Sequence, residues 1–186
     1  MDELAFNQVT AEAIAERAGA SKTTLYRWWP NKAAIVIEAF REAVAPQLPL
    51  EDTGRLLVDL TAQVQNFARV LSGPGGRMLR SLLVAARSDP EVAAAFRSLW
   101  SDPRRTEAKA MLRRKQSSGQ LRKDADLDLV LDSLYGPLYY RFLVKNELPS
   151  QKYAASLASL VVQGLAPIYA VENTAPSKSP HLRNGL

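Results

Sequence analysis

The side chains best suited to chemistry lie close together near the start of the chain, between Arg17 and Lys32. This stretch holds four cationic side chains and no carboxylate, with hydroxyl and aromatic residues among them. Lysine and arginine donate hydrogen bonds to phosphates and base edges, and threonine can also contact the methyl group of thymine. The stretch therefore predicts contacts with a nucleic acid.

The residues that most enzymes use are missing or poorly placed. The 186 residues include no cysteine and a single histidine, His181, which lies near the C-terminal end among prolines and serines. A disulfide, a thiolate site and an imidazole base are therefore not expected. Asp124, Asp126 and Asp128 lack the glycine and the distal glutamate of a calcium loop, and there is no Gly-rich phosphate loop or nucleophile elbow. We predict no enzymatic activity, no metal site and no cofactor.

The composition is that of a chain able to form a substantial core. Hydrophobic residues make up 47% of the sequence and charged residues 23%, as in ordinary globular proteins. The net charge of +5 permits attraction to a nucleic acid over long distances. No leader is recognisable at Met1, and no apolar run approaches the roughly 20 residues that a membrane span needs. We expect a cytoplasmic protein without a membrane partner.

Residues 1–46 are predicted to form a three-helix domain whose first helix is truncated. Thr10, Ser21 and Asn31 precede apolar residues at helical spacing, and their side-chain oxygens suit N-caps. Gly19 and Pro30 end the two helices that begin at Thr10 and Ser21. This order of helix, tight turn and helix is that of a helix-turn-helix, whose second helix enters the major groove of DNA.

Longer helices separated by turns are predicted beyond residue 50, and no segment alternates like a strand. The expected fold class is all-α, with a helix-turn-helix domain at 1–46, a bundle of five or six helices at 50–172, and a flexible tail at 173–186. The helices predicted for the bundle are Thr53–Leu71, Arg77–Arg87, Pro90–Gln116, Asp126–Lys145 and Ser150–Val171.

An alternative interpretation of the first domain needs no DNA. Tyr26, Trp28 and Trp29 would then be packing residues, and the lysines would form a solvated face, because amphipathic helix pairs are common in helical proteins.

The ordered string of residues from Thr10 to Lys32 resembles the signature of the TetR/AcrR family of bacterial regulators. It includes Ile14-Ala15, Ala18 to Lys22, and Thr24 to Lys32. Further along the chain, Asp89–Glu91, Gly119–Arg122 and Leu134–Arg141 resemble the C-terminal domain of one TetR subgroup. The resemblance covers the chain from about Phe6 to Ala166.

The resemblance implies a homodimer that places two recognition helices on a palindromic operator in double-stranded DNA. It also implies a repressor whose operator binding is relieved when a small, largely apolar effector enters the C-terminal domain. The residues expected to contact DNA, with Lys22, Thr23, Thr24 and Arg27 at or near bases and the others at phosphates, are Thr10, Ser21, Lys22, Thr23, Thr24, Tyr26, Arg27, Trp28 and Lys32.

The sequence departs from the family pattern at its N-terminal end. Members usually have a basic arm and a full first helix, whereas only a short segment precedes Asn7 here. That helix would cover Ile14, Leu25 and Ile35, and losing a buried helix face costs several kcal/mol at about 25 cal/mol per Å². We expect either a start upstream of Met1, which we favour, or weakened DNA binding. The second option leaves an alternative function, a dimeric ligand-binding module with impaired DNA binding.

The resemblance implies that residues 50–172 form a ligand-binding and dimerisation domain, and two further sets of residues are expected to serve it. Large side chains should surround an apolar cavity, although they could equally be packed solid; they are Met78, Leu82, Phe96, Trp100, Met111, Tyr135, Tyr139 and Phe142. Apolar stripes on the last two helices should meet a second copy, unless they face the protein's own core; they are Leu131, Leu134, Leu138, Leu157, Leu160, Val161, Gly164 and Leu165.

A basic stretch between Arg97 and Lys123 allows two interpretations. Its cationic side chains would form a second nucleic-acid surface or a solvated helix face, and the second is favoured because the charges recur all around the helix.

Overall fold

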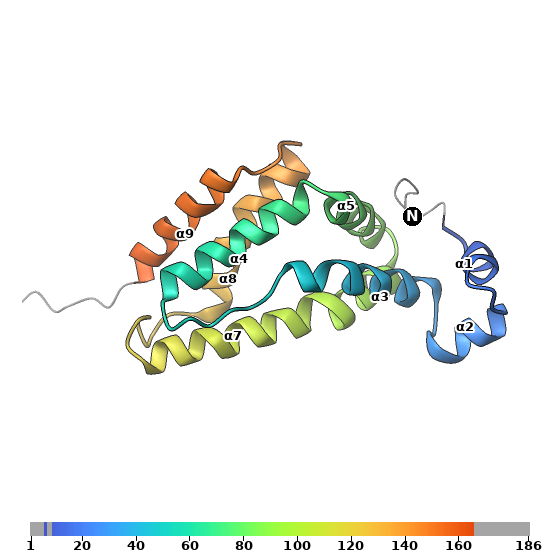
Figure 1. Cartoon of the computed structure of the whole chain (residues 1–186), viewed down its shortest axis with the longest axis horizontal. Coiled ribbons are helices and arrows are strands. Elements are labelled where there is room, and N and C mark those ends of the chain that lie inside the picture. The colour runs from blue at the N-terminus through green and yellow to red at the C-terminus, as the bar shows by residue number, and fades with distance from the viewer. Residues whose placement is uncertain (1–5, 7–8, 166–186) are drawn as a thin grey trace, which may run out of the picture.

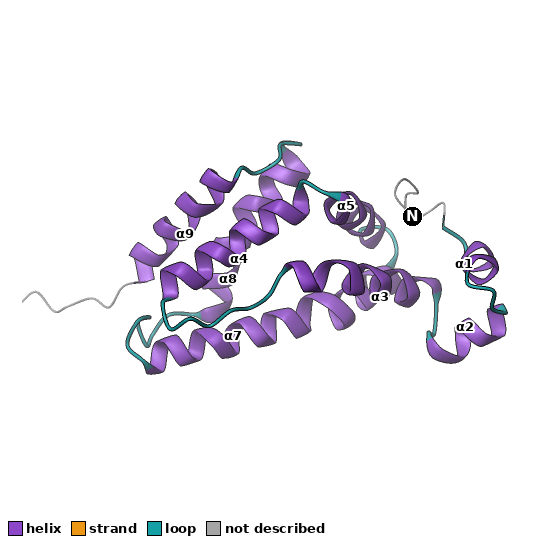
Figure 2. Ribbon diagram, in the orientation of Figure 1, coloured by secondary structure: helices purple, strands orange, loops and turns teal. Residues whose placement is uncertain are grey.

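The computed structural model describes residue 6 and residues 9–165, and the described chain consists of helices joined by short loops (Figure 2). The described residues include no strand. The all-α fold class predicted from the sequence is confirmed. The predicted tail at 173–186 and the predicted helix end at Val171 lie outside the described residues.

The three predicted N-caps of the first domain are confirmed. The helices are α1 (Ala11–Arg17), α2 (Lys22–Trp28) and α3 (Lys32–Val44). The Thr10, Ser21 and Asn31 side chains each accept a hydrogen bond from the backbone N–H three residues later, at 3.1, 3.0 and 2.9 Å. Gly19 has a φ of +62°, which glycine adopts without steric cost, and the chain turns there from α1 towards α2.

Helix α3 has two buried faces that belong to different cores. Ile35 joins Ala15 and Leu25 in a small cluster with α1 and α2. On the other face, Ile37 and Phe40 are fully buried in the main core, which continues through the helices beyond residue 50. Of the three residues expected to need a further helix to cover them, Leu25 and Ile35 are buried, whereas Ile14 is only half-buried. A movement of α3 would therefore disturb the packing of both cores.

The remaining helices form the bundle, with α1 and α2 at one end of the elongated molecule and α9 near the other (Figure 1). A short 3-10 turn, η2 (Ala45–Gln47), leads from α3 into a loop. The bundle helices are α4 (Leu56–Leu71), α5 (Pro74–Ala86), α6 (Pro90–Phe96), α7 (Asp102–Ser117), α8 (Leu127–Tyr139) and α9 (Gln151–Leu165).

Helix α5 begins inside a segment that was predicted to be a turn. Pro74 occupies its first turn, where the missing N–H costs nothing. Gly76 lies so close to the end of α4 that a Cβ placed on it would come 2.1 Å from the carbonyl oxygen of Leu71. Position 76 therefore has no room for a larger residue, because α5 packs closely against the end of α4 there.

Two predicted helices contain π-helical segments. The predicted helix Pro90–Gln116 comprises α6, the π-helical segment η3 (Arg97–Ser101) and α7. Pro103 has no N–H to donate to the carbonyl of Leu99, and such interruptions of the hydrogen-bond ladder favour wider turns. Helix α8 continues through Pro137 into a second π-helical segment, η4 (Tyr140–Val144).

A buried ion cluster fastens the loop before α4 to α4 and α7. The ammonium of Lys115 is almost fully buried and lies 2.6 Å from Asp52 Oδ1 and 2.7 Å from Asp59 Oδ2. Thr53 donates from its backbone N–H to Asp59 at 3.0 Å. Because a buried charge needs close partners, this cluster fixes the register of the loop against both helices.

Candidate nucleic-acid interface and ligand cavity

Helix α2 presents nearly all of its polar side chains to solvent. Lys22, Thr23, Thr24 and Arg27 are exposed, and only Leu25 is buried. An exposed row of donors on a short helix at one end of the molecule fits the shape of a major groove.

The aromatic residues of this segment divide between two roles. Tyr26 is 43% exposed and Trp28 is 69% exposed, so they are not core residues. Trp29 instead packs against the small cluster formed by Ala15, Leu25 and Ile35. The packing alternative therefore describes Trp29 alone, and Tyr26 and Trp28 remain available to phosphates.

Lys22 is held by a carboxylate in this DNA-free structure. Its ammonium forms an ion pair with Glu12 of α1, and the hydrogen bond from Lys22 lowers the pKa of Glu12 while the same bond raises the pKa of Lys22. Both side chains are exposed, so water and DNA can compete for the pair.

Other predicted contact residues also have intramolecular partners. The ammonium of Lys32 donates to the carbonyl of Phe6 at 3.3 Å and lies 4.3 Å from the centre of its ring. The hydroxyl groups of Ser21 and Thr24 lie 2.9 Å apart. The guanidinium of Arg27 lies 5.6 Å from the Trp28 ring. Ser21, Thr24 and Lys32 thus help to fix the domain itself.

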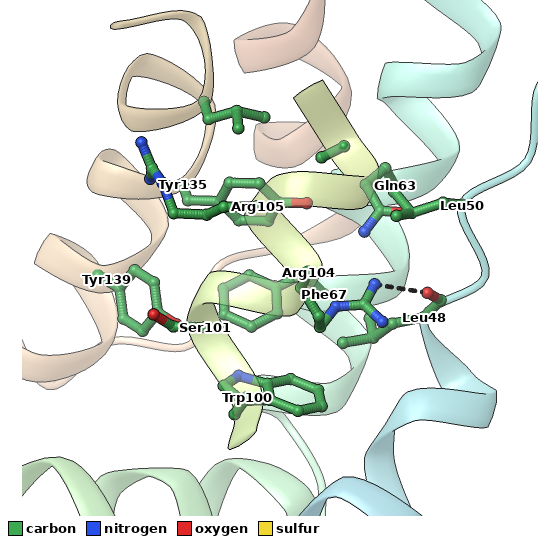
Figure 3. Close-up of a pocket in the computed structure, with 12 residues that line it drawn as sticks. Leu48, Leu50, Gln63, Phe67, Trp100, Ser101, Arg104, Arg105, Tyr135 and Tyr139 are labelled. Carbon is green, nitrogen blue, oxygen red and sulfur yellow. Dashed lines mark hydrogen bonds between the residues drawn. The ribbon is translucent and has the colours of Figure 1, made fainter. Parts of the chain in front are cut away.

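A cavity of about 170 Å³ lies between α4, the η3–α7 segment and α8, beside the loop that follows α3 (Figure 3). Phe67 is one of the lining side chains, and its ring centre lies 5.3 Å from that of Tyr135 and 5.3 Å from that of Tyr139. The lining residues are Leu48, Leu50, Gln63, Phe67, Trp100, Ser101, Arg104, Arg105, Ala108, Leu131, Tyr135 and Tyr139.

Burial raises the pKa of both tyrosine hydroxyl groups of this cavity, which are protonated at neutral pH already at the ordinary value of 10. It raises the pKa of Tyr135, with the Gln63 amide and the charge of Arg104 acting in the opposite direction. It also raises the pKa of Tyr139, well above the usual range. Both hydroxyl groups can therefore donate hydrogen bonds at neutral pH.

A second, larger hollow lies between α3 and α5 and reaches α1. It encloses about 940 Å³ and is lined mainly by apolar side chains, among them Ile14, Ile35 and Leu82. The predicted cavity residues divide between the two spaces. Trp100, Tyr135 and Tyr139 line the smaller cavity, and Met78, Leu82 and Phe142 line the larger one. Phe96 and Met111 line neither of these two and are buried in the main core.

Sequence reasoning missed Gln63 and Arg104 as cavity residues. Gln63 lies on the stripe of α4 that also carries Leu60 and Phe67, and a polar residue within an apolar stripe is a signal that could have marked it. Arg104 follows Pro103 within the basic stretch, where its sequence context resembles that of its solvated neighbours.

Comparison with known proteins decides the family. The family model described as "Bacterial regulatory proteins, tetR family" matches residues 2–39, and that described as "Tetracyclin repressor-like, C-terminal domain" matches residues 50–161. The chain belongs to the TetR family. It is therefore a DNA-binding transcriptional regulator and not an enzyme, and regulators of this family bind operator DNA as dimers.

Individual transcriptional regulators match over most of their length. The HTH-type transcriptional regulator YdeS of Bacillus subtilis is 34% identical, over 92% of this chain and 86% of its own. The DNA-binding transcriptional repressor TetR of Mycobacteroides abscessus is 30% identical, over 77% of this chain and 76% of its own. The crystal structure of the TetR-family regulator SCO0332 superposes with a TM-score of 0.78 at 38% identity, covering 87% of this chain and 90% of that one.

The apolar stripes that this TetR-family chain was predicted to use for dimerisation divide into two groups. Leu131, Leu134, Leu138 and Leu157 are buried in the protomer's own core, as the alternative held. Leu160 is 68% exposed, and a Cβ added to Gly164 would meet no atom within 4 Å. Val161 and Leu165 are half-buried beside them. Leu129 on α8 and Tyr140 and Val144 on η4 are further exposed apolar side chains.

Most of the basic stretch is neutralised within the molecule. Arg105 binds Asp128 and Asp132 at 2.7 Å each. Arg114 and Lys115 bind Asp52 at 2.8 and 2.6 Å. The carboxylates of these pairs join α7 to its neighbours. Arg97, Arg113 and Lys123 are exposed and form no ion pair among the described residues, so the solvated-face interpretation holds for them.

Two kinds of feature are absent from the described part of the chain. None of its helices combines the length and apolarity that crossing a membrane requires. No group of three or more potential metal-binding side chains gathers there.

Proposed function

We propose that this TetR-family regulator is a repressor that binds a palindromic operator as a homodimer and leaves it when a small effector enters the cavity of about 170 Å³. The DNA contacts that we assign to each protomer are those predicted on and around α2. Because the proposed partner is operator DNA, we place the protein in the cytoplasm.

The observation that carries this proposal is the contact between Trp100 and Phe40. Trp100 lines the cavity, and its ring packs edge-on against Phe40 of α3 at 4.8 Å with an interplanar angle of 70°. Phe40 has no exposed surface. A ligand that displaces Trp100 must therefore displace α3 as well, because close-packed interiors transmit strain.

Helix α3 can pass such a displacement to the DNA-contacting helix. Only Trp29, Pro30 and Asn31 separate α3 from α2, and Ile35 packs α3 onto Leu25. A second link joins the same end of α3 to the bundle, since Asn31 donates to Glu91 of α6 at 3.3 Å. A shift of α3 thus changes the distance between the two α2 helices of a dimer, and operators fix that distance.

Dimerisation through α8 and α9 is part of the proposal. The exposed residues Leu129 and Leu160 and the open backbone at Gly164 form the surface that we assign to the partner, together with Val161 and Leu165.

A reporter gene behind DNA taken from around this gene tests the direction of regulation. We expect the wild-type chain to lower reporter expression and Lys22→Ala, which removes a predicted base contact, to restore it. Equal expression with both chains, at equal protein levels, would contradict repression from that site. Higher expression with the wild type than with the variant would identify an activator.

A further inference from the structure

We infer that the cavity between α4, α7 and α8 accepts a single-ring aromatic carboxylate that carries a hydrogen-bond donor elsewhere on its ring. This inference rests on the proposed function, because it takes the cavity to be the effector site. It adds the chemical class of the effector.

The size and walls of the cavity fit one aromatic ring. Its volume is about 170 Å³, and an engineered apolar cavity of about 150 Å³ binds benzene. Phe67, Trp100, Tyr135 and Tyr139 supply four rings around it. Phe67 and Tyr135 are already arranged edge to face, with an interplanar angle of 80°. Aromatic rings attract one another in this arrangement, so a further ring is the best-matched occupant.

Arg104 is the residue that favours a carboxylate on the ligand. Its guanidinium lines the cavity, donates to the carbonyl of Leu48 at 2.7 Å and lies 5.3 Å from the Trp100 ring (Figure 3). Among the described residues it forms no ion pair, whereas the adjacent Arg105 is paired with Asp128 and Asp132. A guanidinium has five N–H donors in a fork that matches a carboxylate. The charge of Arg104 therefore remains for an anionic ligand.

Gln63 is the residue that favours a hydrogen-bond donor on the ring of the ligand. It lines the same cavity and is 6% exposed, yet its Oε1 accepts no hydrogen bond within the described part of the chain. The only other buried oxygen of this kind found there is Asp59 Oδ2, which is paired with Lys115 at 2.7 Å. A buried amide oxygen is costly to leave unpaired. A hydroxyl or amino group on the ligand would satisfy it.

Titration calorimetry on the full chain tests this class directly. The probes are the 2-, 3- and 4-hydroxybenzoates, benzoate, and the uncharged hydroxybenzamides, which have nearly the same shape as the acids. We expect at least one hydroxybenzoate isomer to bind about tenfold or more tighter than its amide and tighter than benzoate, because charge-assisted hydrogen bonds are the stronger ones.

Variants separate the two contacts. Arg104→Gln should weaken binding of the acid about tenfold or more and leave the affinity for the amide nearly unchanged. Gln63→Leu should remove the preference for hydroxybenzoate over benzoate. Arg113→Gln, an exposed residue on the same helix, is the matched control and should bind like the wild type. Circular dichroism verifies that each variant is folded.

The outcomes distinguish this inference from the proposed function. Three results would overturn the ligand class: equal binding of acid and amide, unchanged binding by Arg104→Gln, or no binding of any probe. Operator binding measured without ligand would show separately whether the protein is a DNA-binding regulator as proposed. If a hydroxybenzoate binds as expected and operator affinity does not change, the ligand class holds and release by the ligand is refuted.

Discussion

At the scale of single residues, the ion pair between Glu12 and Lys22 restrains a side chain of α2 that is predicted to contact a base. A lysine that must leave a carboxylate before it reaches DNA gives up part of its binding energy. The pair joins α1 to α2 on an exposed surface, where the coupling is weak in salt. The lysine is therefore restrained and remains exchangeable.

The first prediction uses opposite changes in this pair. Glu12→Gln should tighten operator binding several-fold, because it releases Lys22 and removes a negative charge facing the phosphates. Lys22→Ala should weaken binding about tenfold, the loss of one base contact. Fluorescence anisotropy at fixed salt measures both. Glu16→Gln, which neutralises an exposed carboxylate on the same helix, is the control for net charge, and an equal gain in that variant would refute a specific role for Glu12.

Prediction from sequence succeeded at residues whose function is local and failed where partners are distant. Thr10, Ser21 and Asn31 were identified as N-caps because a cap acts on the backbone three residues away. Gln63 and Arg104 were missed, because a cavity is made by residues from separate helices and no periodicity within one helix specifies it.

At the scale of elements, the cluster of Lys115, Asp52 and Asp59 joins α4, α7 and the preceding loop. Hydrogen bonds from Lys115 and then Arg114 lower the pKa of Asp52 to about 2. Burial acts to raise the pKa of Asp59, but hydrogen bonds from Lys115 and Thr53 outweigh it and the pKa is lowered. Burial acts to lower the pKa of Lys115, and its bonds to both aspartates raise it overall.

The second prediction is that removing the shared cation destabilises the bundle. Lys115→Met leaves Asp59 buried without its counter-ion and should lower the free energy of unfolding by about 3 kcal/mol. Arg114→Met removes the exposed partner of Asp52 and should cost less than about 1 kcal/mol. Urea unfolding at neutral pH measures both. Equal losses in the two variants would show that burial of Lys115 does not matter.

The third prediction concerns pH. The folded pKa values of Asp52 and Asp59 lie below the ordinary value of 3.8, so their contribution is complete above that value and is lost as the pH falls towards 2. The folded pKa of Lys115 lies above 10.5, so its contribution is present below that value and is lost at higher pH. Between pH 4 and 2 the wild type should therefore lose more stability than Lys115→Met. Parallel losses would contradict the cluster's role.

The helices themselves were predicted well, and their interruptions were not. The bundle helices follow from apolar residues at helical spacing, which local sequence records. The start of α5 at Pro74 and the close approach of Gly76 to α4 depend on packing between helices. Pro103 marks a break in the hydrogen-bond ladder, but sequence does not say whether a helix stops there or widens into η3.

At the scale of the whole molecule, helix α3 connects the DNA-contacting helix to the bundle that carries the proposed dimer surface. The α2 helix lies at one end, the exposed part of α8 and α9 lies away from it, and α3 connects the α2 end to the bundle (Figure 1). Because α3 is buried in both cores, the two ends cannot move independently.

The fourth prediction tests the dimer surface. Leu160→Glu places a charge on a side chain that is 68% exposed in the protomer, so folding should be nearly unaffected while the dimer dissociates. Val84→Glu on α5, at 61% exposure, is the matched control and should remain dimeric. Sedimentation velocity gives the masses. A dimer that survives Leu160→Glu would exclude this part of α9 from the interface.

The measurement that tests the central claim most directly is salt-dependent fluorescence anisotropy of the full chain on DNA fragments from around its gene. We predict tight binding to one fragment that weakens as salt rises and is lost in Tyr26→Ala, while the variant keeps its fold and its dimer. Absence of specific binding by a folded wild-type dimer, at low salt and on every fragment, would contradict the operator-binding account and leave a dimeric ligand-binding module.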